Sequence, residues 1–307
     1  MIAYCVSRLL GAALVMSGVL VLVFALLHFV PGDPVEVMLG EHARPADAQA
    51  LRAALGLDLP LHVQFWRFFE GLLRFDLGES LHSRRPINEI LAQRLPATLI
   101  LALASMAIAA LIAFPLGIIA AMRRDTVVDA GAVSFSVLAA AVPNFVLGPL
   151  LILVFALWLG WLPVSGRDSA WSILLPAFTL GASLAAVLSR MVRATLLETF
   201  GHEYIRTARA KGLSEGQVVR RHALGNALLP VVTLAGLQLG VLLAGAVITE
   251  KVFDWPGIGL LLVESIQRRD YPVVQACVLV VSLTYVLVNT LLDFVYAWLD
   301  PRIRLRG

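Results

Sequence analysis

The sequence predicts an all-α, polytopic membrane protein with about six transmembrane helices. Of its 307 residues, 59% are hydrophobic and 15% are charged, whereas soluble domains carry about 25% charged residues. The mean hydropathy is +0.85. In lipid, backbone N–H and C=O groups must find hydrogen-bond partners within the protein. The alternating pattern of β-barrel strands is absent, so the apolar runs are expected to be helical.

Six apolar segments reach the length of about 20 residues that a spanning helix needs. The first is too long for the apolar core of a cleavable signal and lacks a small-residue cleavage site, so we interpret it as an uncleaved span. The expected spans are residues 9–30, 97–122, 132–159, 173–196, 227–249 and 273–299. This divides the chain into a first transmembrane helix (1–30), an extracytoplasmic loop (31–95), a transmembrane domain (96–302) and a cytoplasmic tail (303–307).

Arginine and lysine predict the orientation in the membrane. They collect before the first span, after the second, in the segment 198–226 and beyond the last span. Cytoplasmic loops carry this excess, so both termini are expected to be cytoplasmic. The same bias explains the net charge of +3. No basic stripe alternates with exposed aromatics, which argues against nucleic acid as a partner.

Two outer segments have sequence features of their own. Aromatic residues from Phe65 to Leu72 repeat at helical spacing, which predicts a helix that lies on the membrane surface or caps the bundle; a small lid without ligand contact is an equal alternative. Between the last two spans, the proline and glycines of WPGIG interrupt any helix and indicate a partly re-entrant segment. Its residues of interest are Trp255, Pro256, Gly257 and Gly259.

The polar segment 198–226 has the pattern of two short helices joined by a tight turn. Apolar residues recur at helical spacing up to Ala208, with cations on the opposite side. Gly212 follows the cationic last turn and suits a left-handed C-terminal cap. Ser214, with a glutamine three residues on, forms a capping box for the second helix. Local features alone favour an ordinary solvated connector, since basic cytoplasmic loops are common.

Polar residues inside the expected spans are candidate pathway groups, because such residues are costly in lipid. Ser282, Asn289 and Asp293 share one face of the last span, and Asn144 and Gln238 are weaker cases in the third and fifth. Interhelical hydrogen bonding is the alternative interpretation for all five. No span carries the chain of ionisable groups of a proton relay, which weighs against a secondary active transporter.

Local motifs for catalysis are missing. The sequence has no GxxxxGK[ST], HExxH, GxSxG or CxxC, so no catalytic residues are assigned and an enzyme is not expected. The six histidines are dispersed and none pairs at ligand spacing. No metal site is therefore expected either.

The segment EYIRTARAKGLSEGQVVRRHALGNALLP resembles the coupling loop, called the EAA loop, of permease subunits of ABC importers, in the branch for dipeptides, oligopeptides, glutathione and nickel. FVPGDP, LGLDLPL, DLGES, RLPATL, EKVFDWPGIG, RDYPVVQA and LDPRIR extend the resemblance over nearly the whole chain. One departure is Phe75, where the family more often has glycine. The resemblance implies the type I ABC importer permease fold, with residues 96–302 as the ABC importer transmembrane domain.

The family also implies how the chain works. Its coupling loop would lie in a groove of an ATPase subunit, with Tyr204 and Ala208 supplying buried contact. The residues that the resemblance assigns to this contact are Glu203, Tyr204, Arg206, Thr207, Ala208, Arg209, Lys211, Gly212, Ser214 and His222.

The implied partners are a second homologous permease, two ATPase subunits that bind ATP and Mg, an extracytoplasmic substrate-binding protein that the WPGIG segment would face, and membrane lipid. The chain itself would bind no cofactor. It would lie in the bacterial cytoplasmic (inner) membrane and form half of the pathway for a dipeptide, oligopeptide or glutathione. The alternative substrate is nickel or a nickel chelate, although the spans lack a cluster of histidines or carboxylates; a secondary active transporter is a weaker alternative.

Overall fold

The chain forms a bundle of long helices in the computed structural model, which describes residues 2–29, 35, 44, 46, 49, 52–53 and 56–299. Most of FVPGDP, the expected tail 303–307 and LDPRIR beyond its first residue lie outside these ranges. Five described helices are long and apolar enough to cross a membrane, or six if one bent pair is counted as a span. The expectation of about six spans is confirmed at this level.

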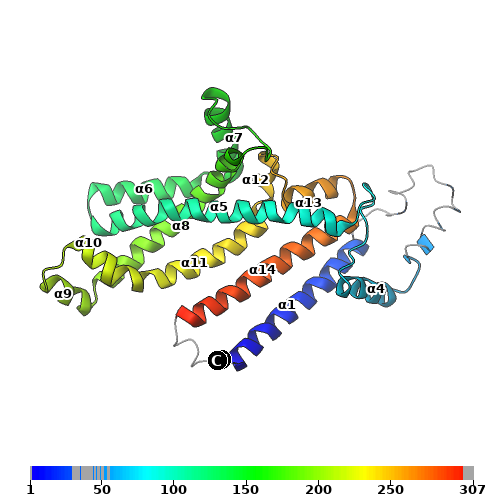
Figure 1. The fold of residues 1–307 in the computed structure, drawn as a ribbon, viewed down its shortest axis with the longest axis horizontal. Helices are drawn as coiled ribbons and strands as arrows, with labels where there is room; N and C mark the ends of the chain where they lie inside the picture. The colour runs from blue at the N-terminus through cyan, green and yellow to red at the C-terminus, as the bar shows by residue number, and fades with distance from the viewer. Residues whose placement is uncertain are drawn as a thin grey trace.

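The helices follow one another with few long connections (Figure 1). The long ones are α1 (Ile2–Phe29), α5 (Ile87–Met122), α8 (Leu174–Phe200), α11 (Leu224–Gly245) and α14 (Tyr271–Leu299). The shorter ones are α4 (Leu61–Leu73), α6 (Val127–Ala141), α7 (Asn144–Leu151), the π-helical η1 (Ile152–Trp158), η2 (Ala170–Ile173), α9 (Glu203–Ala210), α10 (Glu215–Val218), η3 (Val219–Ala223), α12 (Val247–Val252) and α13 (Ile258–Gln267).

Close packing of α5 against α8 builds the core. These two helices run side by side and are rich in alanine where they meet, including Ala109, Ala113 and Ala185. A Cβ on Gly117 would lie 2.7 Å from the carbonyl oxygen of Ser189, so only glycine permits this approach. Small residues at such contacts let helix backbones come close, which is how helices associate in lipid.

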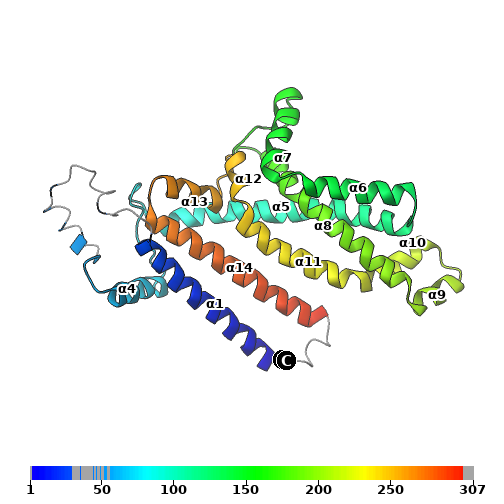
Figure 2. The same ribbon diagram turned by 180° about the vertical axis from the view of Figure 1, so that it is seen from behind.

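The remaining spans add to this core as a row. Figure 2 shows α11, α14 and α1 lying side by side, with α1 at the edge of the molecule. The Arg8 guanidinium and the Asp293 carboxylate form an ion pair of 3.3 Å between α1 and α14. The predicted aromatic helix is α4, and its Phe65 ring meets Phe24 of α1 edge-on at 5.3 Å between centroids. This helix therefore packs on the first span.

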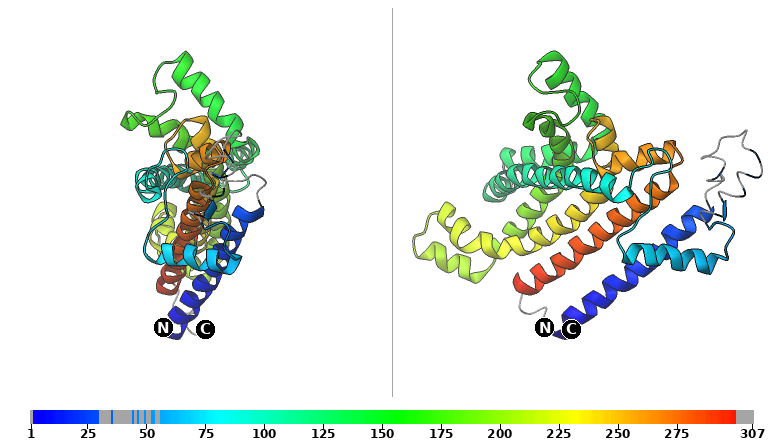
Figure 3. Two further views of the ribbon diagram at one scale, coloured as in Figure 1. Left: turned by 90° about the vertical axis from the view of Figure 1, so that its right-hand side faces the viewer. Right: turned by 45° about the vertical axis from the view of Figure 1, so that its right-hand side comes forward.

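The third expected span is not one straight helix. It is divided into α6 and the continuous α7–η1, which are bent by 98° at a break that contains Pro143. Proline lacks the N–H that would continue the hydrogen-bond ladder and fixes its own φ. Figure 3 shows α7 leaving the bundle steeply, with α12 at its base.

Candidate functional site: the coupling surface and the pathway cavity

The coupling surface, residues 203–222, lies at one end of the bundle, away from α4 and α13 (Figure 1). The expected first helix is α9, which begins at Glu203 because Gly201 and His202 end α8 first. The break changes which residues are buried. Ile205 and Ala208 pack inward, whereas Tyr204 is 40% exposed. Tyr204 therefore stays accessible to a partner, whereas Ile205 and Ala208 pack within this chain.

The tight turn after α9 has the predicted conformation. Gly212 has a φ of +80°, and its N–H donates to the carbonyl oxygen of Arg209 at 2.9 Å. The backbone N–H of Ser214 donates to the side chain of Gln217 at 3.1 Å, and the reciprocal bond to the Ser214 hydroxyl completes the capping box. Both features confirm the helix, turn and helix pattern that the sequence indicates.

The cations of this surface fall into two groups. Arg209 donates to both carboxylate oxygens of Glu215 at 2.8 and 3.1 Å and lies over the Phe200 ring, so it ties the two helices together. Its hydrogen bonds to Glu215 raise the pKa of Arg209. Arg206 forms a pair with Glu203 at 3.2 Å. Lys211 and His222 are exposed.

Tyr204 is held in place by a residue of α11. Its hydroxyl accepts a hydrogen bond from the Asn226 side-chain amide at 2.7 Å, and its ring stacks on His202 with centroids 5.6 Å apart. Thr207 donates its hydroxyl to the Glu203 carbonyl at 3.1 Å. Of the ten residues that the resemblance assigns, all except Ala208 are exposed. The segment thus presents a firm, polar surface at the end of the bundle.

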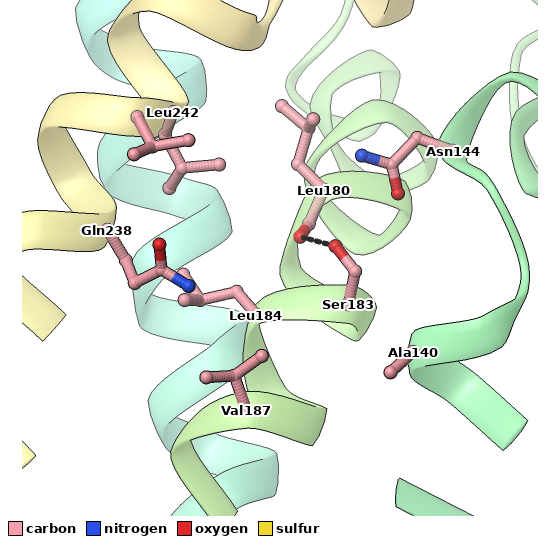
Figure 4. A pocket seen from close by; sticks show the side chains of 9 residues that line it. Ala140, Asn144, Leu180, Ser183, Leu184, Val187, Gln238 and Leu242 are labelled. Carbon is pink, nitrogen blue, oxygen red and sulfur yellow. Dashed lines mark hydrogen bonds between the residues drawn. The ribbon is translucent and has the colours of Figure 1, made fainter. Parts of the chain in front are cut away.

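A cavity of about 280 Å³ lies between α6, α7, α8 and α11 (Figure 4). Asn144 and Gln238, both singled out from the sequence, project toward it from different elements. Ser183 of α8 also lines it, and its hydroxyl donates to the Leu180 carbonyl at 3.1 Å. Leu180, Leu184, Val187 and Leu242 supply the apolar remainder. Ser183 was missed because one serine in an apolar helix gives no pattern.

The polar residues of the last span do not act together. Ser282 lines a separate cavity of about 100 Å³ beside α12 and α13. Asn289 lies against Gly240 of α11 and donates to the Tyr285 carbonyl at 2.8 Å. Asp293 pairs with Arg8 on the opposite neighbour. Of these polar contacts only the Asp293–Arg8 pair joins two helices, and the three side chains do not line one cavity together.

The WPGIG segment is internal to the chain. Trp255 is 2% exposed, and Gly257 and Gly259 are buried as well. The expectation that these residues face an outside partner is wrong, because Trp255 packs on α5 and both glycines lie against α12. Pro256 is half-buried. The proline and glycines lie in the turn between the short helices α12 and α13, as the helix interruption predicts, and a re-entrant path stays a prediction.

Two buried polar contacts were not found from the sequence. Asp129 of α6 accepts both hydrogen bonds of the Arg193 guanidinium at 2.6 and 2.7 Å, and Thr98 of α5 donates to Glu250 of α12 at 2.7 Å. Asp129 and Arg193 are charged residues in apolar surroundings, which was the available signal. Among the described residues, no group of three His, Cys, Asp or Glu side chains is placed to hold a metal ion.

These features define a class. The chain belongs to the family of binding-protein-dependent transport system inner membrane components, whose model matches residues 113–305, and the model of the family's N-terminal part matches residues 1–102. It is a multi-pass inner membrane permease subunit of an ABC importer, in the peptide and glutathione branch.

Two full-length relatives are glutathione transport permeases. The chain is 46% identical over 304 residues to the glutathione transport system permease protein GsiC of Salmonella paratyphi A, and 45% identical to that of Escherichia coli strain K12; both alignments cover 99% of each chain.

Solved structures share the type I importer permease fold. A chain of the MetNI methionine ABC transporter, solved in inward-facing conformations, has a TM-score of 0.60 at 19% identity and covers 69% of this chain and 96% of its own. A chain of an amino acid ABC transporter has a TM-score of 0.55 at 16% identity, with 68% and 93% covered. The likeness concerns the fold.

Proposed function

We propose that this chain is one of two homologous permeases of an ATP-driven importer for small peptides, with glutathione as the first substrate to test. The main support is the coupling surface, which is built from local caps and ion pairs and leaves its polar side chains exposed. The names of the full-length relatives support a substrate of the glutathione type. Nickel or a nickel chelate is the alternative, and no described feature favours it.

Energy would enter through the coupling surface. Of two ATPase subunits, which would bind ATP and Mg in place of this chain, one would receive the exposed, polar side of α9 in a groove. Turning the transporter from about 1:99 to 99:1 between two states needs about 5.5 kcal/mol of differential binding. The short turn at Gly212 and the Arg209–Glu215 pair transmit movement of α9 to α8 and α11.

The substrate would pass along the cavity that Asn144, Ser183 and Gln238 line, opposite the second permease. An extracytoplasmic binding protein would deliver it. With the coupling surface in the cytoplasm, both termini are cytoplasmic and α4 lies outside. Exposed leucines and valines on α1 would face lipid.

The test is uptake by the reconstituted complex. The chain is assembled in proteoliposomes with its second permease, ATPase subunits and binding protein, and uptake of labelled glutathione, a dipeptide and nickel is measured with and without ATP. ATP-dependent uptake of glutathione or the dipeptide is expected. Uptake of nickel alone, or uptake on an ion gradient without ATP, would overturn the proposal.

Gly212 and Gly216 form a matched pair for the coupling role. A Cβ added at either position would meet no atom within 4 Å, but only Gly212 has a positive φ. Gly212→Ala is expected to lower uptake roughly tenfold, since a left-handed alanine costs about 1–2 kcal/mol. Gly212→Pro should abolish it. Gly216→Ala should transport normally, and equal uptake by the Gly212 variants and wild type would exclude the coupling role.

A further inference from the structure

Glu250 is a fully buried carboxylate that joins three elements. It lies on α12 at 0% exposure. The Thr98 hydroxyl of α5 donates to its Oε1 at 2.7 Å, and the Leu260 N–H of α13 donates to its Oε2 at 2.9 Å. The Thr98 oxygen in turn accepts the Ile258 N–H at 2.8 Å. A hydroxyl and a helix N-terminus therefore share one carboxylate.

Glu250 and Thr98 supply the cap that α13 lacks locally. The first four N–H groups of a helix have no intrahelical partner, and Gly257 at the N-cap has no side chain to offer. The carboxylate also lies where the helix dipole favours negative charge. A Cβ on Gly257 would collide with the Glu250 carboxylate, so the carboxylate requires glycine at this position.

Trp255 makes a second attachment to the same turn of α5. Its backbone N–H donates to the Glu250 carbonyl at 2.8 Å, and its indole N–H donates to the Ala97 carbonyl at 2.9 Å. Farther along, Ile258 and Leu261 pack with Ile87 and Leu91 of α5. The segment from α12 to α13 is thus fixed to the first half of α5 at several points.

This attached segment adjoins two of the elements that line the pathway cavity, α7 and α11. α12 follows α11, which carries Gln238 and Leu242 of the cavity lining. On the other side, Gly148 of α7 faces Val252 and Phe253 so closely that an added Cβ would lie 3.1 Å from the Phe253 ring. Figure 3 shows α12 at the base of α7. Any movement of α12 therefore moves a boundary of the cavity.

We propose that Glu250 is a positioning residue that makes α12, the turn and α13 one rigid body with the outer half of α5. The outer end of the pathway then opens and closes by movement of this body, and the turn at residues 253–257 does not act as a hinge. The role in opening the pathway rests on the proposed transport function, whereas the rigidity of the body can be measured without transport.

The rigid body is tested by distances between spin labels in the assembled complex. Labels replace Glu89 on α5 and Arg268 at the end of α13, both exposed, after Cys5→Ser and Cys277→Ala. The distance is expected to be the same in nucleotide-free and nucleotide-trapped complexes. In Glu250→Ala the distribution of label distances should broaden, or its centre should shift between the two states. Glu264→Ala, on α13 with the Arg268 label, should leave the distribution unchanged. A wild-type distance that changes with nucleotide overturns the proposal, as does an unaltered distance in Glu250→Ala.

Thr98 offers variants that keep the volume of the site. Thr98→Val is nearly isosteric and removes the hydroxyl, whereas Thr98→Ser retains it. Thr98→Val deprives a Glu250 oxygen and the Ile258 N–H of this hydroxyl partner, and Glu250→Gln puts an NH2 donor where an oxygen now accepts. Both are expected to lower uptake per ATP hydrolysed by about tenfold. Thr98→Ser should keep the wild-type ratio.

The ratio separates this role from a merely structural one. If the variants reduce only the yield of complex and each assembled complex keeps the wild-type ratio, the positioning role is excluded. If wild type fails to transport any peptide while the label distance stays constant, the proposed function fails and the rigid body stands.

Discussion

At the residue scale, Phe75 adopts a left-handed backbone conformation that its side chain disfavours. It has a φ of +57°, a region that glycine occupies more readily, and its ring is 84% exposed. The Asn88 side-chain amide donates to its carbonyl oxygen, and the Asp76 N–H bonds to Gly71 at 2.8 Å. The tight turn that glycine favours is thus retained in its absence.

Phe75→Gly is expected to stabilise the chain. Relief of the left-handed strain is worth about 1–2 kcal/mol, and the greater freedom of glycine in the unfolded chain offsets about 0.5–1 kcal/mol of it. Thermal unfolding of the purified chain in detergent should therefore show a higher midpoint. Leu73→Gly, in the last turn of α4, should lower the midpoint, and a lower midpoint for Phe75→Gly would contradict the explanation.

Which residue conformations could be predicted depended on how local their causes are. Gly212 and Ser214 were placed correctly, because a cap is determined by residues within one turn. Ile205 was missed because the apolar spacing up to Ala208 assumes one continuous helix, whereas α8 ends before Gly201 and α9 begins at Glu203. Glu250 could not be found, since its partner Thr98 is 152 residues away in the chain.

At the element scale, polar contacts join α6 to α8. The Asp129 side chain is 6% exposed and accepts two hydrogen bonds from Arg193, and the Asp125 N–H donates to it at 3.1 Å. One turn or two farther along, the Ser136 and Ser189 hydroxyls lie 2.9 Å apart. Because α8 continues toward α9, these contacts connect the broken third span to the helix that leads into the coupling surface.

Arg193→Gln is expected to destabilise the chain by about 1 kcal/mol, because a partly exposed ion pair is lost and the Asp125 N–H still bonds to the carboxylate. Asp129→Asn with Arg193→Gln should cost less than the two single changes added together, since the pair acts as a unit. Unfolding in detergent measures all three. Strict additivity would show that the pair has no coupling energy.

The length of the apolar segments predicted which helices exist, but it did not predict how the helices bend. The long helices were predicted because about 20 apolar residues satisfy the bilayer whatever they pack against. The 98° bend of the third span depends on how α7 meets α12, and the sequence offered only Pro143 as a signal.

At the scale of the whole molecule, the two ends of the bundle differ in kind. One carries the coupling surface and the connection after α5; the other carries α4 and α13 (Figure 1). Arg123, Arg124, Arg220 and Arg221 lie at the first end. These arginines lie in or beside short connections, where the rule that cytoplasmic loops are rich in arginine and lysine applies, and they support the proposed orientation.

Reporter fusions should reveal this orientation. A reporter active only in the cytoplasm should work when fused after Arg124 or Gly216 and at either terminus, and one active only outside should work after Glu79 or Gly166. The opposite pattern at any two of these sites would reverse the proposed orientation.

The bend between α6 and α7 has a chemical consequence for the cavity wall. The last four carbonyls of a helix have no partner within it, and α6 ends at Ala141, next to Ala140 and Asn144 of the lining. Main-chain acceptors at the end of α6 therefore lie close to a largely aliphatic wall. Carbonyl oxygens can accept hydrogen bonds from the amide groups of a peptide. They remain whatever side chain replaces the native one. An alanine scan of the wall would leave this part of its polarity intact.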